Sequence, residues 1–154
     1  YSVALKKFPS HNVISVRGII ATPDQEAVLW KQLAHERNAQ NIQLSNPAWN
    51  IAKFHNEGFV EENLDVGIQQ TVVGQYKDTE MMKFKAVEEI TAATLTFRGK
   101  YELLPEANEE VIRWIADNHY ELTGNHFNIY HISPETEQNI ENMITEVCFP
   151  IKPK

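Results

Sequence analysis

A chain of 154 residues and 17.7 kDa is long enough for one domain, or for two small repeated units that share a core. Hydrophobic residues make up 42% and charged residues 23%, which excludes wholesale disorder. With 14 Lys and Arg against 21 Asp and Glu, the formal net charge of −7 argues against direct binding to DNA or RNA. The single Cys148 excludes an internal disulfide framework and a zinc-finger or iron–sulfur architecture.

Other features of the composition bear on the cellular context of the protein. No apolar run approaches the roughly 18 residues that a membrane-spanning helix needs. One cysteine is compatible with a reducing compartment, so we expect a cytoplasmic protein with no membrane partner and no cofactor. The chain starts at Tyr1 instead of Met with residues typical of a strand, which suggests a domain cut from a longer protein.

The first half of the chain predicts a strand, a helix and two further strands. Val13–Ile20 is β-branched and apolar, as strands are. The segment 22–25 has a capping-box pattern with Thr22 as N-cap, which predicts the start of a helix. The residues of this helix expected to face a sheet are Ala27, Trp30, Leu33 and Ala34. The two following strands are expected at 49–55 and 64–73.

The second half repeats this order of elements. Strands are expected at 84–87 and 92–98. Pro105 then opens a helix that ends near His119. Its apolar stripe is formed by Ala107, Val111, Trp114 and Ile115. The last two strands are expected at 127–132 and 143–151, and the polar segments at 77–81 and 133–142.

An internal repeat connects the two halves. The tripeptide Val16-Arg17-Gly18 recurs as Phe97-Arg98-Gly99, 81 residues later, and the same offset carries Asp65 onto Glu146. We therefore predict a single domain made of two related halves, at about residues 1–76 and 77–154. The expected fold class is α+β, with a mostly antiparallel sheet, helices on one face and a pseudo-twofold axis between the halves.

Side chains alternate between the two faces of a strand, so the positions of acids in the predicted strands can be assigned to a face. Asp65 and Glu146 lie on the faces opposite the predicted helices, next to a cleft between the halves. A carboxylate in an aromatic cleft is a natural partner for a cationic or polar organic ligand. Alternatively, both acids are ordinary solvated residues, although Glu146 has almost uncharged neighbours along its strand.

Several segments together resemble a known family. They are Leu29-Trp30, Asn63 to Val66, Gly99 to Glu102 and Thr145 to Lys152. This ordered set is similar to the gyrase-inhibitor-like effector-binding domain of MerR-type regulators, such as the BmrR-like multidrug sensors, and of some AraC-type regulators. The opening of the chain, with Leu5-Lys6 and Pro9, looks most like the MerR-type group.

The resemblance implies a duplicated strand-helix-strand-strand fold with a ligand cleft between the repeats. It also implies a glutamate in the last strand that faces the cleft, a place that Glu146 fits. Tyr130, Tyr101 and Trp30 stand at positions of the family pattern and are candidate ligand contacts. Many relatives have an acid two positions before the tyrosine, where this chain has Asn128, so a second acidic contact is in doubt. The candidate ligand-binding residues are therefore Glu146, Tyr130, Trp30, Tyr101, Trp49 as a possible lid, and Asp65.

Two classes of function remain open at this point. The first is a small-molecule sensor for a hydrophobic, aromatic or cationic ligand, with DNA bound by a separate domain and a homodimeric full-length regulator. The second is a stand-alone hydrolase of reactive small molecules in which Glu146 assists water attack. A stand-alone binder or gyrase-inhibitor-like protein is a further alternative. No metal site is expected, because the spacing of His119, His126 and His131 matches no standard ligand pattern.

Overall fold

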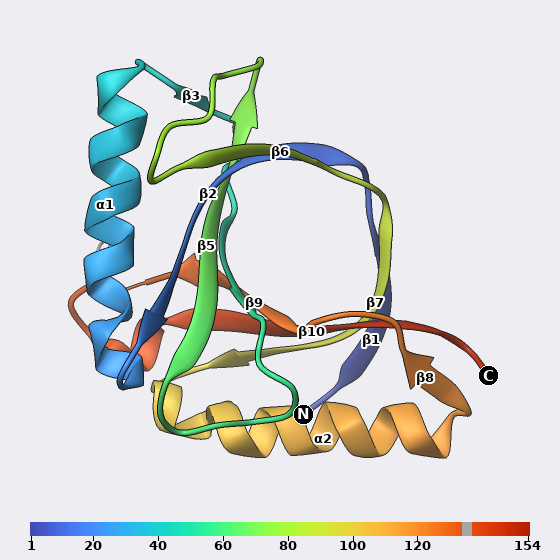
Figure 1. The fold of residues 1–154 in the computed structure, drawn as a ribbon. Helices are drawn as coiled ribbons and strands as arrows, with labels where there is room; N and C mark the ends of the chain where they lie inside the picture. Colours follow the sequence, from blue (N-terminus) through green and yellow to red (C-terminus); the bar gives the residue numbers. More distant parts are fainter. Residues whose placement is uncertain (134–136) are drawn as a thin grey trace. The chain divides into compact units, whose positions relative to one another are not determined.

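The computed structural model describes residues 1–133 and 137–154. The chain divides into two compact units, which we describe separately. Unit 1 contains residues 1–9 and 89–154, and unit 2 contains residues 10–88. Each unit combines antiparallel strands with a 14-residue α-helix (Figure 1), which confirms the expected α+β class. In the described part of the chain, no helix is long and apolar enough to cross a membrane.

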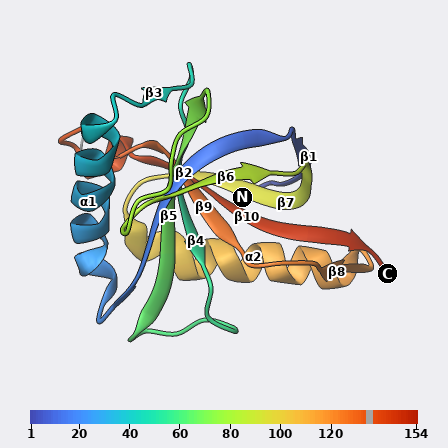
Figure 2. The ribbon, with the colours of Figure 1, turned by 45° about the horizontal axis from the view of Figure 1, so that its top comes forward.

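Unit 2 has four strands in a row with a helix on one side. Their order is β4 (Asn50–Phe54), β5 (Leu64–Val73), β2 (His11–Ile20) and β6 (Lys83–Val87), and all neighbours are antiparallel. The short strand β3 (Gln43–Leu44), which the sequence did not predict, pairs with β5. Helix α1 (Glu26–Ala39) packs against β2 and β5 (Figure 2).

The sheet-facing side of α1 differs from the predicted one. The helix buries Leu29 and Leu33, whereas Ala27 is exposed and Trp30 is half-buried. A short 3₁₀ turn over Pro23–Gln25 precedes α1, so the α-helical register starts later than the sequence suggests. As a result, Leu29 and Leu33, four residues apart, form the side of α1 that packs on the sheet.

The predicted capping box is also wrong in its details. The side chain of Thr22 bonds with that of Asp24 and caps no backbone group of the helix. The Oε1 atom of Gln25 instead accepts a hydrogen bond at 3.0 Å from the backbone N–H of Ala21. The side chain of Gln25 therefore fixes the entry of the chain into the turn, while Thr22 contributes only its backbone carbonyl, which accepts from the N–H of Gln25 at 3.1 Å.

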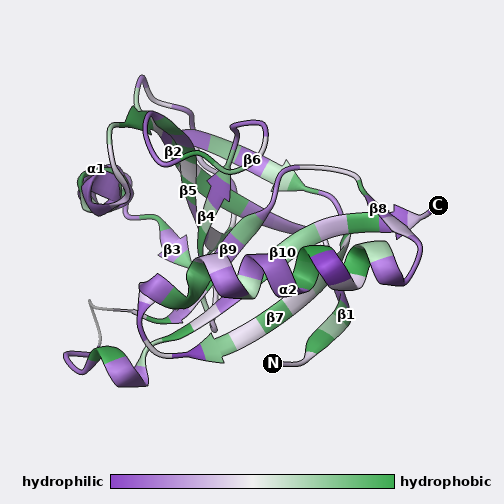
Figure 3. Cartoon of the chain, turned by 90° about the horizontal axis from the view of Figure 1, so that it is seen from below, coloured by the Kyte–Doolittle hydropathy of each residue, from purple (hydrophilic) through white to green (hydrophobic). Residues whose placement is uncertain are grey.

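Unit 1 has the same arrangement of elements. Its strand order is β9 (Phe127–Ile132), β10 (Ile144–Pro153), β7 (Ile90–Arg98) and β1 (Val3–Phe8), again antiparallel throughout. An unpredicted strand, β8 (Tyr120–Leu122), pairs with β10. Helix α2 (Leu104–Asp117) packs against β7, β8 and β10, and the alternation of hydrophobic and hydrophilic residues along it can be followed in Figure 3. Two 3₁₀ turns cover Tyr101–Leu103 and Ile140–Asn142.

The core of unit 1 lies between α2 and its sheet. Most of the predicted stripe of α2 is confirmed as buried, but Trp114 is only partly buried and stacks on Tyr120, with ring centroids 5.6 Å apart. Among the described residues, the buried cluster between α2 and the sheet consists of Ala93, Leu95, Phe97, Ala107, Val111, Ile115, Val147, Phe149 and Ile151. The alternation along β7 and β10 puts Val147 on the helix side of the sheet and Glu146 on the other side.

The two units repeat one strand order, so they can be compared position by position. Both β2 and β7 occupy third place in the row, and they start at His11 and Ile90, 79 residues apart. With that offset the paired residues of β2 and β5 fall on those of β7 and β10. The sequence offset of 81 is therefore shifted by two in the strands, which keeps every side chain on its predicted face.

The edges of the units differ from the predicted halves at 1–76 and 77–154. Strand β1 pairs with β7 in unit 1, and β6 pairs with β2 in unit 2. Each unit therefore takes its edge strand from beyond the boundary that the repeat suggests, because strand pairing and not chain order decides membership. The single-domain organisation and the cleft between the halves stay predictions. The predicted connection at 133–142 includes residues 134–136, which lie outside the described residues.

Candidate functional site

The most unusual residue of unit 1 is Glu146, in the middle of β10. Its side chain is only 3% exposed, and its strand neighbours are Thr96 on β7 and Ile129 on β9. It lies on the sheet face turned away from α2, as the sequence predicted. A carboxylate this deeply buried has to be compensated by charges or hydrogen bonds, because desolvation alone would cost several kcal/mol.

Both carboxylate oxygens of Glu146 have partners within unit 1. The Nζ atom of Lys6 on β1 donates to Oε2 at 2.8 Å. The Nε2–H of His131 on β9 donates to Oε1, also at 2.8 Å, since an ionised carboxylate can only accept. Lys6 is 46% exposed and His131 is 35% exposed, so the two donors reach from solvent to the buried acid. The result is a three-residue network, which we name the Glu146 network.

The network controls the ionisation of its acid. Burial raises the pKa of Glu146, but hydrogen bonds from His131, Lys6 and Thr94 and the charge of Lys6 outweigh burial and lower that pKa to about 2. Glu146 is therefore a carboxylate at neutral pH, with its charge balanced by Lys6. A pKa this low also makes Glu146 a weak proton acceptor.

Apolar side chains surround the Glu146 network on the same face. The rings of Phe8 and Phe127 meet edge to face, with centroids 5.8 Å apart, and both are buried. Cys148 is fully buried two residues after Glu146, and burial is the main reason that the pKa of its thiol is raised. A protonated, buried thiol is no nucleophile. The face thus combines one carboxylate with aromatic and aliphatic walls.

Two predicted contacts, Tyr101 and Tyr130, come together but on the other side of the sheet. Their ring centroids are 5.7 Å apart, in an edge-to-face arrangement. Tyr130 lies between Ile129 and His131 on β9, so alternation directs it to the α2 side, away from Glu146. Asn128 is on that side too, and within the described residues its buried Oδ1 atom has no hydrogen-bond partner. The ligand-binding role of the two tyrosines stays a prediction.

The other three predicted residues belong to unit 2. Asp65 accepts two hydrogen bonds of 2.8 Å from the Nε and Nη2 atoms of Arg17. These hydrogen bonds are the largest cause of the lowered pKa of Asp65. Trp30 donates through its indole N–H to Glu26 at 3.0 Å, and Trp49 contacts His11 with ring centroids 6.1 Å apart. The predicted site residues thus form separate groups in the two units, and their roles as contacts stay predictions.

Sequence reasoning missed the partners of Glu146. Lys6 was noted only as part of a family-like opening, and His131 only as one of three histidines rejected as metal ligands. The alternating pattern of Phe127–Ile132 places His131 on one face with Phe127 and Ile129, which is a readable signal. Whether His131 reaches Glu146 depends on the register between β9 and β10. Whether Lys6 reaches it depends on the pairing of β1 with β7. Neither register can be derived from the local sequence.

Comparisons with known proteins place these features in context. Residues 2–152 match the model of the GyrI-like small molecule binding domain. Among curated proteins, none matches this chain.

Several solved structures share the fold along the whole chain. The crystal structure of the EcmrR C-terminal domain has a TM-score of 0.95 and 28% sequence identity, covering 100% of this chain and 99% of that chain. EcmrR in a cryo-EM complex with DNA has a TM-score of 0.95 and 27% identity, covering 99% of this chain but 58% of that chain. The structure of SAV2435 bound to tetraphenylphosphonium has a TM-score of 0.63 and 15% identity, covering 99% and 94% of the two chains, and shows a shared fold alone.

Proposed function

Since the chain belongs to the GyrI-like small molecule binding domain family, we propose that it is the effector-binding domain of a bacterial transcription regulator. The full-length similarity to the C-terminal domain of EcmrR, a MerR-type regulator, supports this proposal. The present chain spans 58% of the EcmrR chain that was solved with DNA. In the proposed regulator, a separate domain contacts DNA, the full-length protein is a homodimer, and it acts in the cytoplasm.

The observation that carries the proposal is the buried carboxylate of Glu146 between aromatic and aliphatic walls. Buried ion pairs are often replaceable by apolar residues without loss of stability, so a buried carboxylate is a candidate for a role beyond folding. A hydrophobic, aromatic ligand with a positive charge suits this surface, since apolar walls favour the rings and the carboxylate favours the charge. Tyr101, Tyr130, Trp30, Trp49 and Asp65 remain candidate contacts, at lower priority than Glu146.

Lys6 gives the site a physical means to distinguish its empty and bound states. Without ligand, Nζ of Lys6 compensates the carboxylate of Glu146 at 2.8 Å. A cationic ligand that reaches Glu146 has to compete with this ammonium group. The contact between Lys6 on β1 and Glu146 is then present in the empty state and weakened in the bound state. A sensor needs such a difference in interactions between its two states.

The hydrolase alternative has less support. General-base catalysis at neutral pH requires a group with a pKa near the working pH. The Glu146 carboxylate, with a pKa of about 2 and two hydrogen-bonded partners, lacks that property. We therefore prefer the sensor to the enzyme.

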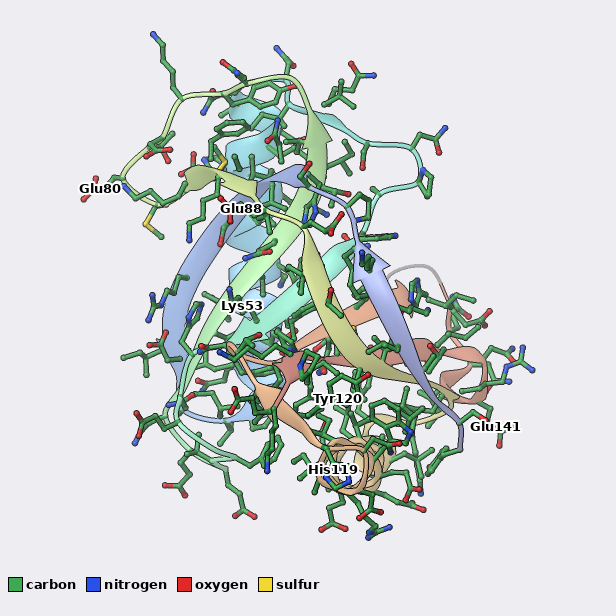
Figure 4. The ribbon with its side chains drawn as sticks, turned by 90° about the vertical axis from the view of Figure 1, so that its right-hand side faces the viewer. Lys53, Glu80, Glu88, His119, Tyr120 and Glu141 are labelled. Carbon is green, nitrogen blue, oxygen red and sulfur yellow. The ribbon has the colours of Figure 1, made fainter. Side chains whose placement is uncertain are left out.

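The first experiment measures the melting temperature with and without tetraphenylphosphonium for the wild type and Glu146→Gln. We expect the cation to raise the melting temperature of the wild type, with an apparent affinity reduced at least tenfold in Glu146→Gln because the charge partner is lost. The matched control is Glu141→Gln, which removes an exposed acid in the same unit and should respond like the wild type. Glu141 is labelled in Figure 4.

A second variant separates failure of the site from poor folding. Lys6→Met removes the ammonium group that competes with the ligand for Glu146. The same concentration of tetraphenylphosphonium should therefore raise the melting temperature of Lys6→Met more than that of the wild type. Equal shifts in the wild type, Glu146→Gln and Lys6→Met would exclude Glu146 as the ligand contact.

A further inference from the structure

Unit 2 has a polar sheet face that corresponds to the Glu146 face of unit 1. A Cβ atom added to Gly18 would lie 3.0 Å from Leu29 on α1, so Gly18 points at the helix and its neighbour Arg17 points away. Residues directly opposite each other on paired strands share a face. Arg17 on β2 stands opposite Gly67 on β5, which stands opposite Lys53 on β4. Figure 4 looks onto this face, with α1 behind the strands and Lys53 labelled on β4.

The strand registers identify the counterpart of each member of the Glu146 network. Gly67, opposite Arg17, takes the place of Glu146, which stands opposite Thr96. Along the edge strands, Lys85 on β6 takes the place of Lys6 on β1. Each unit therefore has a lysine at this position of its edge strand, but unit 2 has a glycine where unit 1 has the glutamate.

Strand β4 of unit 2 corresponds to β9 of unit 1. Lys53, opposite Gly67, takes the place of Ile129, opposite Glu146. Two residues further along, His55 takes the place of His131. A Cβ atom added to Gly67 would lie 3.0 Å from Nε2 of His55, so this imidazole reaches the glycine as His131 reaches Glu146. Unit 2 keeps the two donors of the network, lacks the carboxylate and adds a second lysine.

The positive charge on this face is only partly compensated. Arg17 is bound to Asp65, and Lys83 lies 3.9 Å from Asp78. Among the residues that the structure describes, neither Lys53 nor Lys85 makes an ion pair. Two unpaired cations on one face contrast with the net charge of −7 of the whole chain.

The ionisation of the neighbouring groups reflects this excess. Burial, and then the charges of Lys85 and Arg17, lower the pKa of Lys53. Burial and the charge of Arg17 likewise lower the pKa of His55; Asp65 opposes this effect, and Lys53 and Lys85 add to it. A bound anion would relieve the repulsion between Lys53 and Lys85, because it would compensate both ammonium groups.

Two buried polar side chains lie between the charged groups. Ser15 on β2 stands opposite Gln69 on β5, on the same face as Arg17 and Gly67. They are 3% and 8% exposed, respectively. In residues 1–133 and 137–154, no side-chain hydrogen bond is made by either of them. The Ser15 hydroxyl and the Gln69 amide are hydrogen-bond donors that a ligand on this face can use.

We propose that this face of unit 2 binds the oxyanion group, carboxylate or phosphate, of a small molecule. In the bound state the oxyanion lies beside the imidazole of His55, which covers Gly67, and within reach of both lysines. Lys53 and Lys85 compensate its charge, and His55, Ser15 and Gln69 offer hydrogen-bond donors. The site lies outside unit 1 and does not depend on the proposed role of Glu146.

The test measures binding of phenyl phosphate and benzoate by isothermal titration calorimetry. Benzyl alcohol is the neutral probe of similar size. We expect phenyl phosphate, benzoate or both to bind the wild type, and benzyl alcohol to bind at least tenfold more weakly. Binding of phenyl phosphate alone identifies a phosphate site, and binding of both identifies a general oxyanion site. If neither anion binds better than benzyl alcohol, the proposal is wrong.

Variants then locate the site. Lys53→Met and Lys85→Met should each weaken anion binding at least tenfold, which corresponds to about 1.4 kcal/mol. Lys53→Arg should restore most of the affinity. The matched control is Lys31→Met, which removes one exposed charge from α1 in the same unit and should bind like the wild type. Equal anion affinity in the wild type, Lys53→Met and Lys85→Met would overturn the proposal, whatever the result with tetraphenylphosphonium.

Discussion

The two units place a lysine and a histidine at corresponding positions, but only unit 1 has a buried carboxylate between them. In unit 1, Lys6 and His131 hold the carboxylate of Glu146, and the pair of opposite charges is complete. In unit 2, Lys85 and His55 stand at corresponding positions around Gly67, a glycine replaces the glutamate, and the nearby Asp65 is bound to Arg17. The comparison teaches that a buried ionisable position can be stabilised from within the chain or left for a ligand to complete.

The largest expected effect is the pH dependence that Glu146 confers on unit 1. The folded-state pKa of about 2 lies below the ordinary value of 4.5, which corresponds to about 3 kcal/mol of stability in total. Because the folded pKa is depressed, this contribution is complete above about pH 5 and is lost as the pH falls toward 2. Urea unfolding at pH 7 and pH 3 should show a loss about 2 kcal/mol larger in the wild type than in Glu146→Gln. Equal losses would contradict the assigned ionisation.

The next effect compares one substitution at two corresponding positions. Lys6→Met removes the only lysine bound to a buried carboxylate in the described residues, and should lower the free energy of unfolding by about 1–2 kcal/mol. This value is below that for a fully buried pair because Lys6 is 46% exposed. Lys85→Met removes a lysine with no acid partner in the described part of unit 2, and should change stability by less than about 0.5 kcal/mol. Both values follow from urea unfolding at pH 7.

Lys7→Met is the control for the position on β1. Lys7 is exposed, directly follows Lys6 and points to the opposite face of the strand. It should match the wild type within about 0.5 kcal/mol. If Lys6→Met is as stable as Lys7→Met, the ion pair with Glu146 contributes nothing to folding.

A further substitution builds the missing acid into unit 2 and is read mainly through ligand binding. Gly67→Glu places a carboxylate where its counterpart stands in unit 1, among Lys53, Lys85 and His55. The new Cβ atom is 3.0 Å from Nε2 of His55, the end of a flexible side chain that can move. We expect a change in stability below about 1 kcal/mol and a loss of phenyl phosphate binding of at least tenfold. Gly67→Gln, which lacks the charge, should retain more of the binding; equal binding in both variants would contradict the correspondence.

Individual elements show which parts of the fold could be read locally. The strands at 64–73 and 127–132 were predicted at their observed bounds, because β-branched and apolar residues fill them and turn residues flank them. The stripe of α2 was largely correct, since Ala107, Val111 and Ile115 are all buried. The stripe of α1 was not, because its apolar pattern is weak and a 3₁₀ turn shifts its start.

The candidate site divides in the same way. Glu146 on the non-helical face followed from period-two alternation, and the structure places it there. Its partners Lys6 and His131 come from strands 140 and 15 residues away in sequence. Nothing in the local sequence reports such distances, because strand pairing depends on tertiary register.

The sequence by itself determined the α+β class, the family resemblance, the duplicated order of elements and the face on which Glu146 lies. These properties follow from periodicity and composition, which act over a few residues. Tertiary structure alone decided that Glu146 is bound by Lys6 and His131, and that Gly67 takes the corresponding place between Lys53, Lys85 and His55. Charge compensation is a property of atoms close in space, and the chain brings those atoms together only when its strands pair.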